Sequence, residues 1–165
     1  MATITAGGRE IHTQGELPSV GSIAPGFTLT KTDFSTGSLG DYKGKKVILN
    51  IFPSLDTSTC AASVRKFNET AADLDNTVVL CISKDLPPAH RRFCETEGIK
   101  NVTTLSDFRN NNFADAYQNI FIDGRLAGLL SRCIVVIDEN GIVKYTEQVA
   151  ETGNEPDYAS ALAAL

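Results

Sequence analysis

Three short stretches of the chain are almost continuously apolar, and they set the spacing of the other elements. They are KVILNIF (Lys46–Phe52), TVVLCIS (Thr77–Ser83) and CIVVID (Cys133–Asp138). Runs of this length, rich in β-branched residues, predict strands that are covered on both faces. Amphipathic patterns at helical spacing lie between them, so strands and helices alternate as in βαβ units around a central mixed sheet.

The remainder of the chain predicts hairpins, turns and a closing helix. The opening TITAGGREIHTQG indicates a hairpin that turns at Gly7-Gly8, and we expect residues 1–15 to extend a single domain that spans residues 1–165. IVVIDENGIVKYTEQV predicts a second hairpin, and EPDYASALAAL predicts a C-terminal helix. Together these elements predict an α/β, thioredoxin-like fold with a central mixed sheet flanked by helices and an N-terminal β-hairpin.

A loop-rich section precedes the first apolar run. FTLT predicts a short strand there, and Gly37, Gly40 and Gly44 each mark a turn. This section is the least regular part of the predicted fold.

A helix is predicted to begin near Cys60, because apolar residues recur there at steps of four and three. They are Cys60, Val64, Phe67, Ala71 and Leu74. The preceding DTST contains only residues that can cap a helix by accepting backbone N–H groups. A cysteine in a first turn faces the positive end of the helix dipole, which favours a thiolate. The pattern indicates a reactive thiol at Cys60, with an inert buried cysteine as the alternative.

The other three cysteines occupy less distinctive positions. Cys81 lies within one apolar run and Cys133 begins another, so we expect both in the core. Cys94 lies on the largely apolar stripe of a short helix after Pro87-Pro88, where spacing alone favours burial. The chain has no CxxC, the spacing of redox dithiols and of paired zinc ligands, and we expect neither a metal nor a cofactor.

The only two histidines are His12 and His90, and either is in principle a base for Cys60. His12 falls in the terminal hairpin and His90 on the helix stripe, which argues against a protease-like Cys-His pair.

Composition excludes several classes of protein. The chain has 165 residues, 42% hydrophobic and 21% charged, as is ordinary for one globular domain. Its net charge of −5 argues against a nucleic-acid surface, and no segment approaches the roughly 18 apolar residues of a membrane span. The N-terminus lacks the basic start and apolar run of a secretory signal, and four cysteines are too few for a disulfide scaffold. We therefore expect a cytoplasmic protein.

The stretch PSLDTSTCAASVRKFN resembles the thiol peroxidase branch of the peroxiredoxins, the atypical two-cysteine kind. The resemblance extends over essentially the whole chain and includes NTVVLCIS, RFC, TLSDFRN and SRCIVVIDENG. The element Pro-x-x-x-Thr-x-x-Cys is that family's peroxide site, and Pro53, Thr57 and Cys60 match it. One departure is Cys133, where we expect a small apolar residue. Because side chains alternate along a strand, Cys133 should point away from the face that Arg132 occupies.

The resemblance implies a role for each matched residue. Cys60 is the peroxidatic thiolate, and Cys94 is the resolving thiol that forms an intrachain Cys60–Cys94 disulfide with it. Thr57 and Arg132 hold and polarise the peroxide, and Pro53 shields the site from water. Since a disulfide requires Cα atoms within about 7 Å, we expect one or both cysteine-bearing helices to unfold locally during turnover.

The resemblance also implies the partners. The substrates are hydrogen peroxide and organic (alkyl or lipid) hydroperoxides, the reductant is thioredoxin, and the protein is a homodimer. Two other functions on the same fold are a thiol-disulfide oxidoreductase and a redox sensor. The first requires a CxxC at the helix start, where TSTC has threonine instead.

Overall fold

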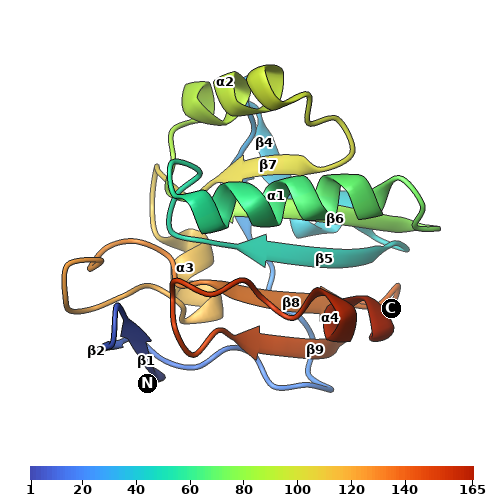
Figure 1. The fold of residues 1–165 in the computed structure, drawn as a ribbon. Coiled ribbons are helices and arrows are strands. Elements are labelled where there is room, and N and C mark those ends of the chain that lie inside the picture. Colours follow the sequence, from blue (N-terminus) through green and yellow to red (C-terminus); the bar gives the residue numbers. More distant parts are fainter.

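The computed structural model describes residues 1–165 and contains one seven-stranded sheet and one two-stranded sheet. The strand order of the large sheet is β4-β3-β7-β6-β5-β8-β9 (Figure 1). Its strands are β3 (Thr28–Thr30), β4 (Thr36–Ser38), β5 (Lys46–Ile51), β6 (Thr77–Ser83), β7 (Thr103–Ser106), β8 (Cys133–Ile137) and β9 (Val143–Gln148). The run β7-β6-β5 is parallel and the remaining pairs are antiparallel, which confirms the predicted central mixed sheet.

The three apolar runs form the centre of this sheet. β5 lies between β6 and β8, and all five residues of β8 are buried. Ile48 and Leu49 of β5 have no exposed surface although they point to opposite faces. Both faces of the sheet are covered, which is why these strands are apolar throughout rather than alternating.

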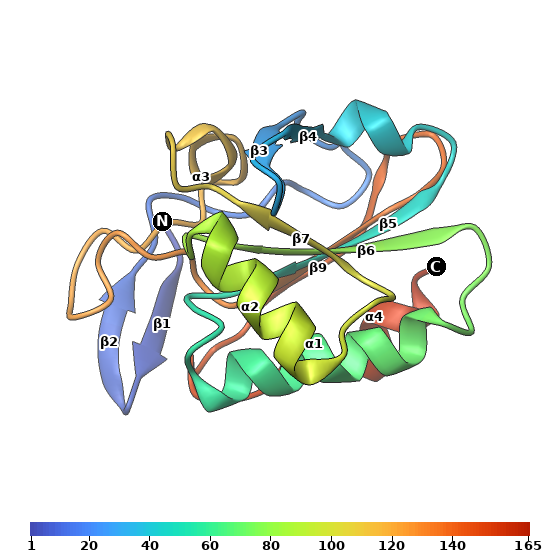
Figure 2. The ribbon, with the colours of Figure 1, turned by 90° about the horizontal axis from the view of Figure 1, so that it is seen from above.

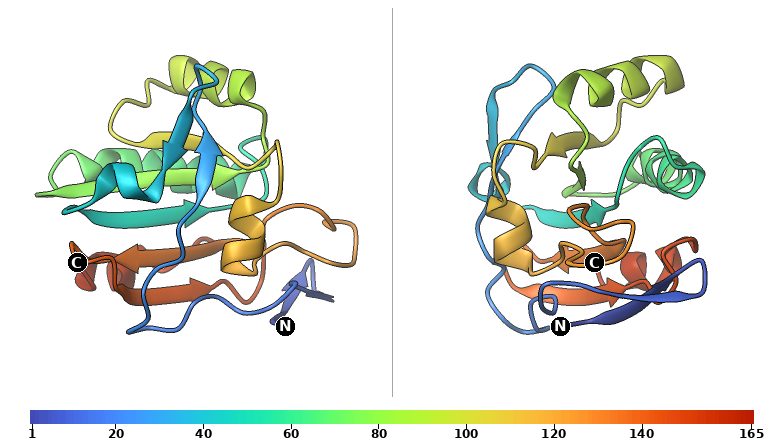
Figure 3. Two further views of the ribbon diagram at one scale, coloured as in Figure 1. Left: turned by 180° about the vertical axis from the view of Figure 1, so that it is seen from behind. Right: turned by 90° about the vertical axis from the view of Figure 1, so that its left-hand side faces the viewer.

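Helices cover the two faces unequally (Figures 2 and 3). On one face lie α1 (Ser58–Ala71), α2 (Pro87–Glu97) and α4 (Tyr158–Ala163). On the other lie α3 (Asn112–Tyr117) and the 3-10 helix η1 (Leu39–Tyr42). Each face of the sheet has its own apolar core. Successive residues of β8 contribute to these cores alternately: Cys133 packs on the α3 side and Ile134 on the α1 side.

The N-terminal hairpin forms the two-stranded sheet, with β1 (Thr3–Ala6) antiparallel to β2 (Arg9–His12). Gly7 and Gly8 make the predicted turn, with φ angles of 60° and 77° that glycine adopts without strain. The hairpin lies at the end of the sheet from which α1 starts (Figure 1). It has its own small core, formed by Ile4, Ala6, Ile11 and Phe121.

Some sequence expectations were wrong in detail. Gly37 lies within β4 and makes no turn; a Cβ there would come within 2.9 Å of a Leu105 methyl group, so close packing requires glycine. Leu74 lies beyond the end of α1, although it still packs against the α1-side core. α4 is shorter than EPDYASALAAL suggested, because Asp157 caps it by accepting from the Ser160 N–H. None of the helices has the length and hydrophobicity to cross a membrane.

Candidate active site

Cys60 lies in the first turn of α1, at the carboxyl end of the parallel strand β5. β5 ends at Ile51, residues 52–57 form a loop, and α1 begins at Ser58. Cys60 has no exposed surface, and Pro53 in the preceding loop is buried as well. Loops at the carboxyl ends of parallel strands are the usual position of active sites in α/β folds. The cysteine is therefore placed as the sequence predicted, and its side chain is fully covered.

The helix start differs from the predicted cap in one respect. Thr57 is the N-cap residue and has an extended backbone, but its side chain accepts no N–H group of the helix. Its hydroxyl instead donates to the Ser54 carbonyl oxygen at 3.1 Å. The N–H groups of Ser58, Thr59 and Cys60 consequently have no acceptor in the protein. The first turn thus presents unpaired donors and the positive end of the dipole beside the thiol, which suits an anion.

Asp85 anchors the loop that leads to Cys60, a contact that the sequence analysis missed. Its carboxylate accepts from the Ser54 hydroxyl at 2.7 Å and from the Leu55 N–H at 2.8 Å. It also accepts from the Ser83 hydroxyl at 2.6 Å. Asp85 lies two residues after the end of β6, and a polar residue just past a buried strand was the available signal. The loop before α1 is therefore fixed by the segment that leads into α2.

His90 completes this buried polar network. Its Nε2 lies 2.9 Å from the Ser83 hydroxyl oxygen. Because that hydroxyl donates its proton to Asp85, Nε2 must carry a proton and donate to it. Burial lowers the pKa of His90 to about 4, so the ring is neutral at neutral pH. Nδ1 is buried and has no hydrogen-bond partner.

Arg132 lies at the same end of the sheet as the loop before α1. β8 pairs with β5 so that Cys133 lies opposite Ile51, and Arg132 directly precedes Cys133. The Arg132 carbonyl accepts from the Val149 N–H just after β9, which extends the β8–β9 pairing by one residue. Side chains alternate along a strand, so Arg132 shares the α1 face with Ile134 and points away from Cys133.

The guanidinium of Arg132 is buried and only partly bonded. The side chain is 3% exposed. Nε donates to the Thr152 carbonyl oxygen at 2.8 Å, whereas Nη1 has no partner and no carboxylate pairs with the group. A buried cation with a free donor is costly unless it serves a ligand or a charge that forms during a reaction.

Cys94 lies near the C-terminal end of α2 and is partly exposed. Burial raises the pKa of its thiol, and a hydrogen bond with Thr104 of β7 acts in the opposite direction. The thiol borders a cavity of about 360 Å³ between α2 and β7, whose walls include Lys31 and Lys100. Cys94 and Cys60 contact the same apolar cluster, but Cys94 is directed toward β7.

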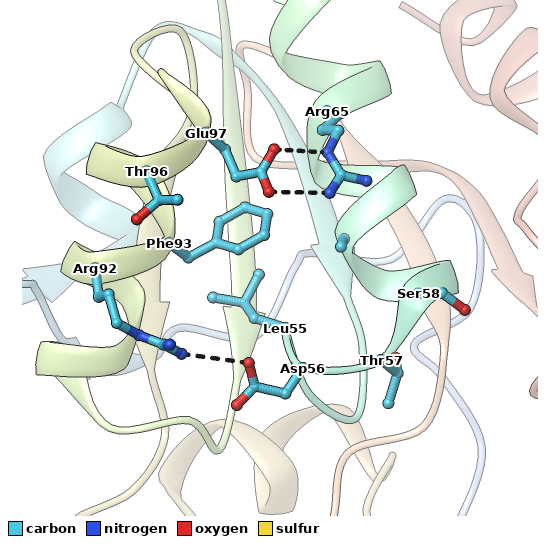
Figure 4. A pocket seen from close by; sticks show the side chains of 10 residues that line it. Leu55, Asp56, Thr57, Ser58, Arg65, Arg92, Phe93, Thr96 and Glu97 are labelled. Atoms are coloured by element: carbon cyan, nitrogen blue, oxygen red, sulfur yellow. Dashed lines mark hydrogen bonds and ion pairs between the residues drawn. The ribbon is translucent and has the colours of Figure 1, made fainter.

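Another cavity, of about 280 Å³, lies between α1 and α2, the helices that carry Cys60 and Cys94 (Figure 4). Arg65 of α1 makes a bidentate pair with Glu97 of α2, at 2.9 and 3.1 Å. Arg92 of α2 reaches Asp56 in the loop before α1 at 3.4 Å. Phe93 projects between the two ion pairs. Arg65, five residues after Cys60, therefore holds α1 to α2.

Cys81 and Cys133 are core residues, as predicted. Both are completely buried, and burial raises the pKa of each thiol to about 12. Asn50 donates to the Cys81 sulfur at 3.6 Å and Asn119 donates to the Cys133 sulfur at 3.5 Å. All four cysteines of the chain are free thiols.

Neither histidine hydrogen-bonds to Cys60. His12 is held in the hairpin by Asp123, with its Nδ1 2.7 Å from the carboxylate, and His90 belongs to the network around Asp85. No three His, Cys, Asp or Glu side chains are grouped to hold a metal ion. The chemistry offered by this end of the sheet is that of a cysteine at a helix start, on the same face as a partly bonded arginine.

A thioredoxin-like fold with a cysteine at a helix start is typical of thiol-based redox proteins. Comparison with known proteins narrows this class to one family. Residues 19–162 match the Redoxin family. The thiol peroxidase of Corynebacterium glutamicum is 55% identical over 159 residues, which cover 96% of this chain and 95% of that protein. The thiol peroxidase of Mycobacterium tuberculosis is 54% identical over 165 residues, 100% of this chain and 99% of that protein.

A solved structure indicates the same family as these two relatives. The peroxiredoxin-like protein from Aquifex aeolicus superposes with a TM-score of 0.92 at 34% sequence identity, covering 98% of this chain and 94% of that one. The chain therefore belongs to the thiol peroxidase family of the redoxins, and the predicted fold class is confirmed. It is an enzyme, a peroxidase of the peroxiredoxin type.

Proposed function

We propose that this chain is an atypical two-cysteine peroxiredoxin, which reduces hydrogen peroxide and organic hydroperoxides to water and alcohols. The observation that carries the proposal is the position of Cys60. It lies in a helix first turn whose N–H groups lack acceptors, on the sheet face that also bears the partly bonded Arg132. Unpaired donors of this kind stabilise both a thiolate and the oxyanion that leaves a cleaved peroxide.

In the first step the Cys60 thiolate attacks the outer oxygen of the hydroperoxide. An S–O bond forms, the O–O bond breaks, and the departing hydroxide or alkoxide takes a proton to become water or an alcohol. The sulfur is oxidised by two electrons to a sulfenic acid. Arg132 and Thr57 hold the two peroxide oxygens in line with the sulfur, and Pro53 keeps water from the site. The Nη1 of Arg132 is the free donor available to the leaving oxygen.

In the second step the Cys94 thiolate attacks the Cys60 sulfenic sulfur. An S–S bond forms and hydroxide leaves, which a proton converts to water. The two helices must open for this step, because Cys60 is covered and Cys94 faces β7. α2 is the element suited to opening. Two residues of α2, Pro87 and His90, are buried, against five in α1, so α2 loses less buried contact than α1 when it unwinds.

A dithiol then restores both thiols, and we propose thioredoxin for this role. The dithiol attacks the Cys60–Cys94 disulfide through a mixed disulfide and leaves oxidised. We further propose that the enzyme is a cytoplasmic homodimer. Four cysteines in 165 residues are too few for a disulfide scaffold, which supports a reducing compartment.

Replacing each proposed redox cysteine separately tests this scheme. With an excess of hydrogen peroxide or of an alkyl hydroperoxide, and with thioredoxin present as reductant, Cys60→Ser should consume none. Cys94→Ser should consume one equivalent per subunit and then fail to turn over with thioredoxin. Cys133→Ala, which alters a buried thiol outside the site, is the matched control and should behave as the native enzyme. Full turnover by Cys94→Ser with thioredoxin would remove Cys94 from the mechanism. A native enzyme that consumes one equivalent and stops would favour a redox sensor.

A further inference from the structure

The segment of residues 150–153, after β9, contacts both Arg132 and the first turn of α1. The Thr152 carbonyl oxygen accepts from the Arg132 Nε at 2.8 Å. The next carbonyl, that of Gly153, accepts from the Thr59 hydroxyl at 3.0 Å. Thr59 is the residue directly before Cys60. Two consecutive carbonyl groups are thus in contact with the two parts of the proposed peroxide site.

The N-terminal hairpin holds this segment through Glu151. The Glu151 carboxylate accepts from the Thr5 hydroxyl at 2.7 Å and from the N–H groups of Gly7 and Gly8 at 2.9 and 3.1 Å. These hydrogen bonds lower the pKa of Glu151 to about 2, so the group stays ionised over the physiological range. The positive φ angles of the two glycines turn consecutive N–H groups toward one anion, as in a backbone nest.

Backbone bonds join the hairpin to the same segment on either side of Glu151. The Thr5 N–H donates to the Ala150 carbonyl, and the Thr152 N–H donates to the Thr5 carbonyl, each at 2.8 Å. The Thr152 peptide is therefore fixed on one side by the hairpin and on the other by Arg132. Because Arg132 has no carboxylate partner, the Thr152 carbonyl is the acceptor that orients its guanidinium.

We propose that the N-terminal hairpin is a positioning element of the peroxide site and that Glu151 is the residue through which it acts. By clamping the hairpin turn, Glu151 fixes the Thr152 carbonyl, and this carbonyl orients Arg132. Glu151 touches neither peroxide nor sulfur, so it is a positioning residue. The inference rests on the proposed role of Arg132 in peroxide cleavage.

A double-mutant cycle between Glu151 and Arg132 tests the inference. The quantity measured is the rate constant of peroxide consumption by the pre-reduced enzyme, in competition with a haem peroxidase. Glu151→Ala should lower this rate constant about 10- to 100-fold, since displacements of about 1 Å have such effects. In an Arg132→Met background the same substitution should change the rate less than twofold. Glu139→Gln, an exposed carboxylate in the β8–β9 turn, should leave the rate unchanged.

The outcomes separate the inference from the proposed function. A native rate for Glu151→Ala, or equal losses in both backgrounds, would overturn the positioning role while leaving Arg132 in the mechanism. A native rate for Arg132→Met would overturn the role of Arg132, and the inference with it. If Glu151→Ala does not fold, Glu151→Gln keeps the side-chain size and one acceptor oxygen. The same cycle with that variant should then show a smaller loss that again disappears in the Arg132→Met background.

Discussion

Replacing Arg132 with methionine separates a catalytic role of this residue from a structural one. The substitution keeps a long side chain and removes the guanidinium. Arg132 is 3% exposed, donates from Nε to Thr152, and has a free Nη1. A cation that only stabilised the fold would have a carboxylate beside it, and Arg132 has none.

The expected loss of activity is large and the expected loss of stability is small. Removing one donor to a developing oxyanion lowers rates about 10²- to 10³-fold, and we expect this loss in the peroxide step. The Thr152 carbonyl loses its partner, which costs about 1 kcal/mol. Removing a buried charge that has no counter-ion offsets that cost, because methionine needs no desolvation of charge. The net change should lie within about 1 kcal/mol, or about 2–4 °C in Tm for a chain of this length.

The peroxide step is followed by competition with a haem peroxidase, and stability by thermal unfolding monitored by circular dichroism. Arg109→Met, an exposed arginine that lies over the ring of Phe108, is the control and should change neither quantity appreciably. A fall in Tm of more than about 8 °C with a rate within threefold of the native value would contradict a catalytic role for Arg132. Arg132 would then be a structural residue.

Three further predictions concern burial and the contact between the helices. Burial lowers the pKa of His90 to about 4, so the stability contributed by the neutral ring is present above about pH 6.5 and is lost as the pH falls toward 4. Between pH 7 and pH 4.5, the unfolding free energy measured in urea should therefore fall by about 2–3 kcal/mol less in His90→Gln than in the native protein. An equal fall in both proteins would contradict this prediction. The pKa of about 12 at Cys81 and Cys133 leaves a thiolate fraction of about 10⁻⁴ at pH 8, so iodoacetamide should label both in urea and neither in the native protein. Glu97→Gln removes the ion pair between α2 and α1. Disulfide formation after a peroxide pulse should then be about two- to fivefold faster, because α2 opens more easily. Slower disulfide formation would contradict the proposed opening of α2.

Much of the fold follows from local patterns in the sequence. Lys46–Phe52, Thr77–Ser83 and Cys133–Asp138 are continuously apolar and become the buried centre of the sheet. The spacing of Cys60, Val64 and Phe67 predicts the buried face of α1. Such patterns are informative because one face of a helix, or both faces of a covered strand, must exclude water along consecutive residues.

The sequence predicted the reactive cysteine of the site, but few of the residues that surround it. Spacing alone indicated a thiol at a helix start, and the family resemblance supplied Arg132. Asp85 and Glu151 were missed, because each acts through contacts with residues distant in the chain. Gly37 was misassigned to a turn for a similar reason. The side chain of Leu105, brought alongside by sheet pairing, is what excludes a larger residue there.

Local sequence patterns are sufficient to predict the mixed sheet, the family and the cysteine at the helix start. These features depend on the order of residues within single elements and on a motif of eight residues. Which groups surround that thiol depends on the tertiary structure. It placed Arg132 on the α1 face, gave its guanidinium the Thr152 carbonyl as an acceptor, and joined the loop before Cys60 to Asp85. Those contacts bring together segments that are far apart in the chain, and strand pairing and core packing fix them where local sequence patterns do not.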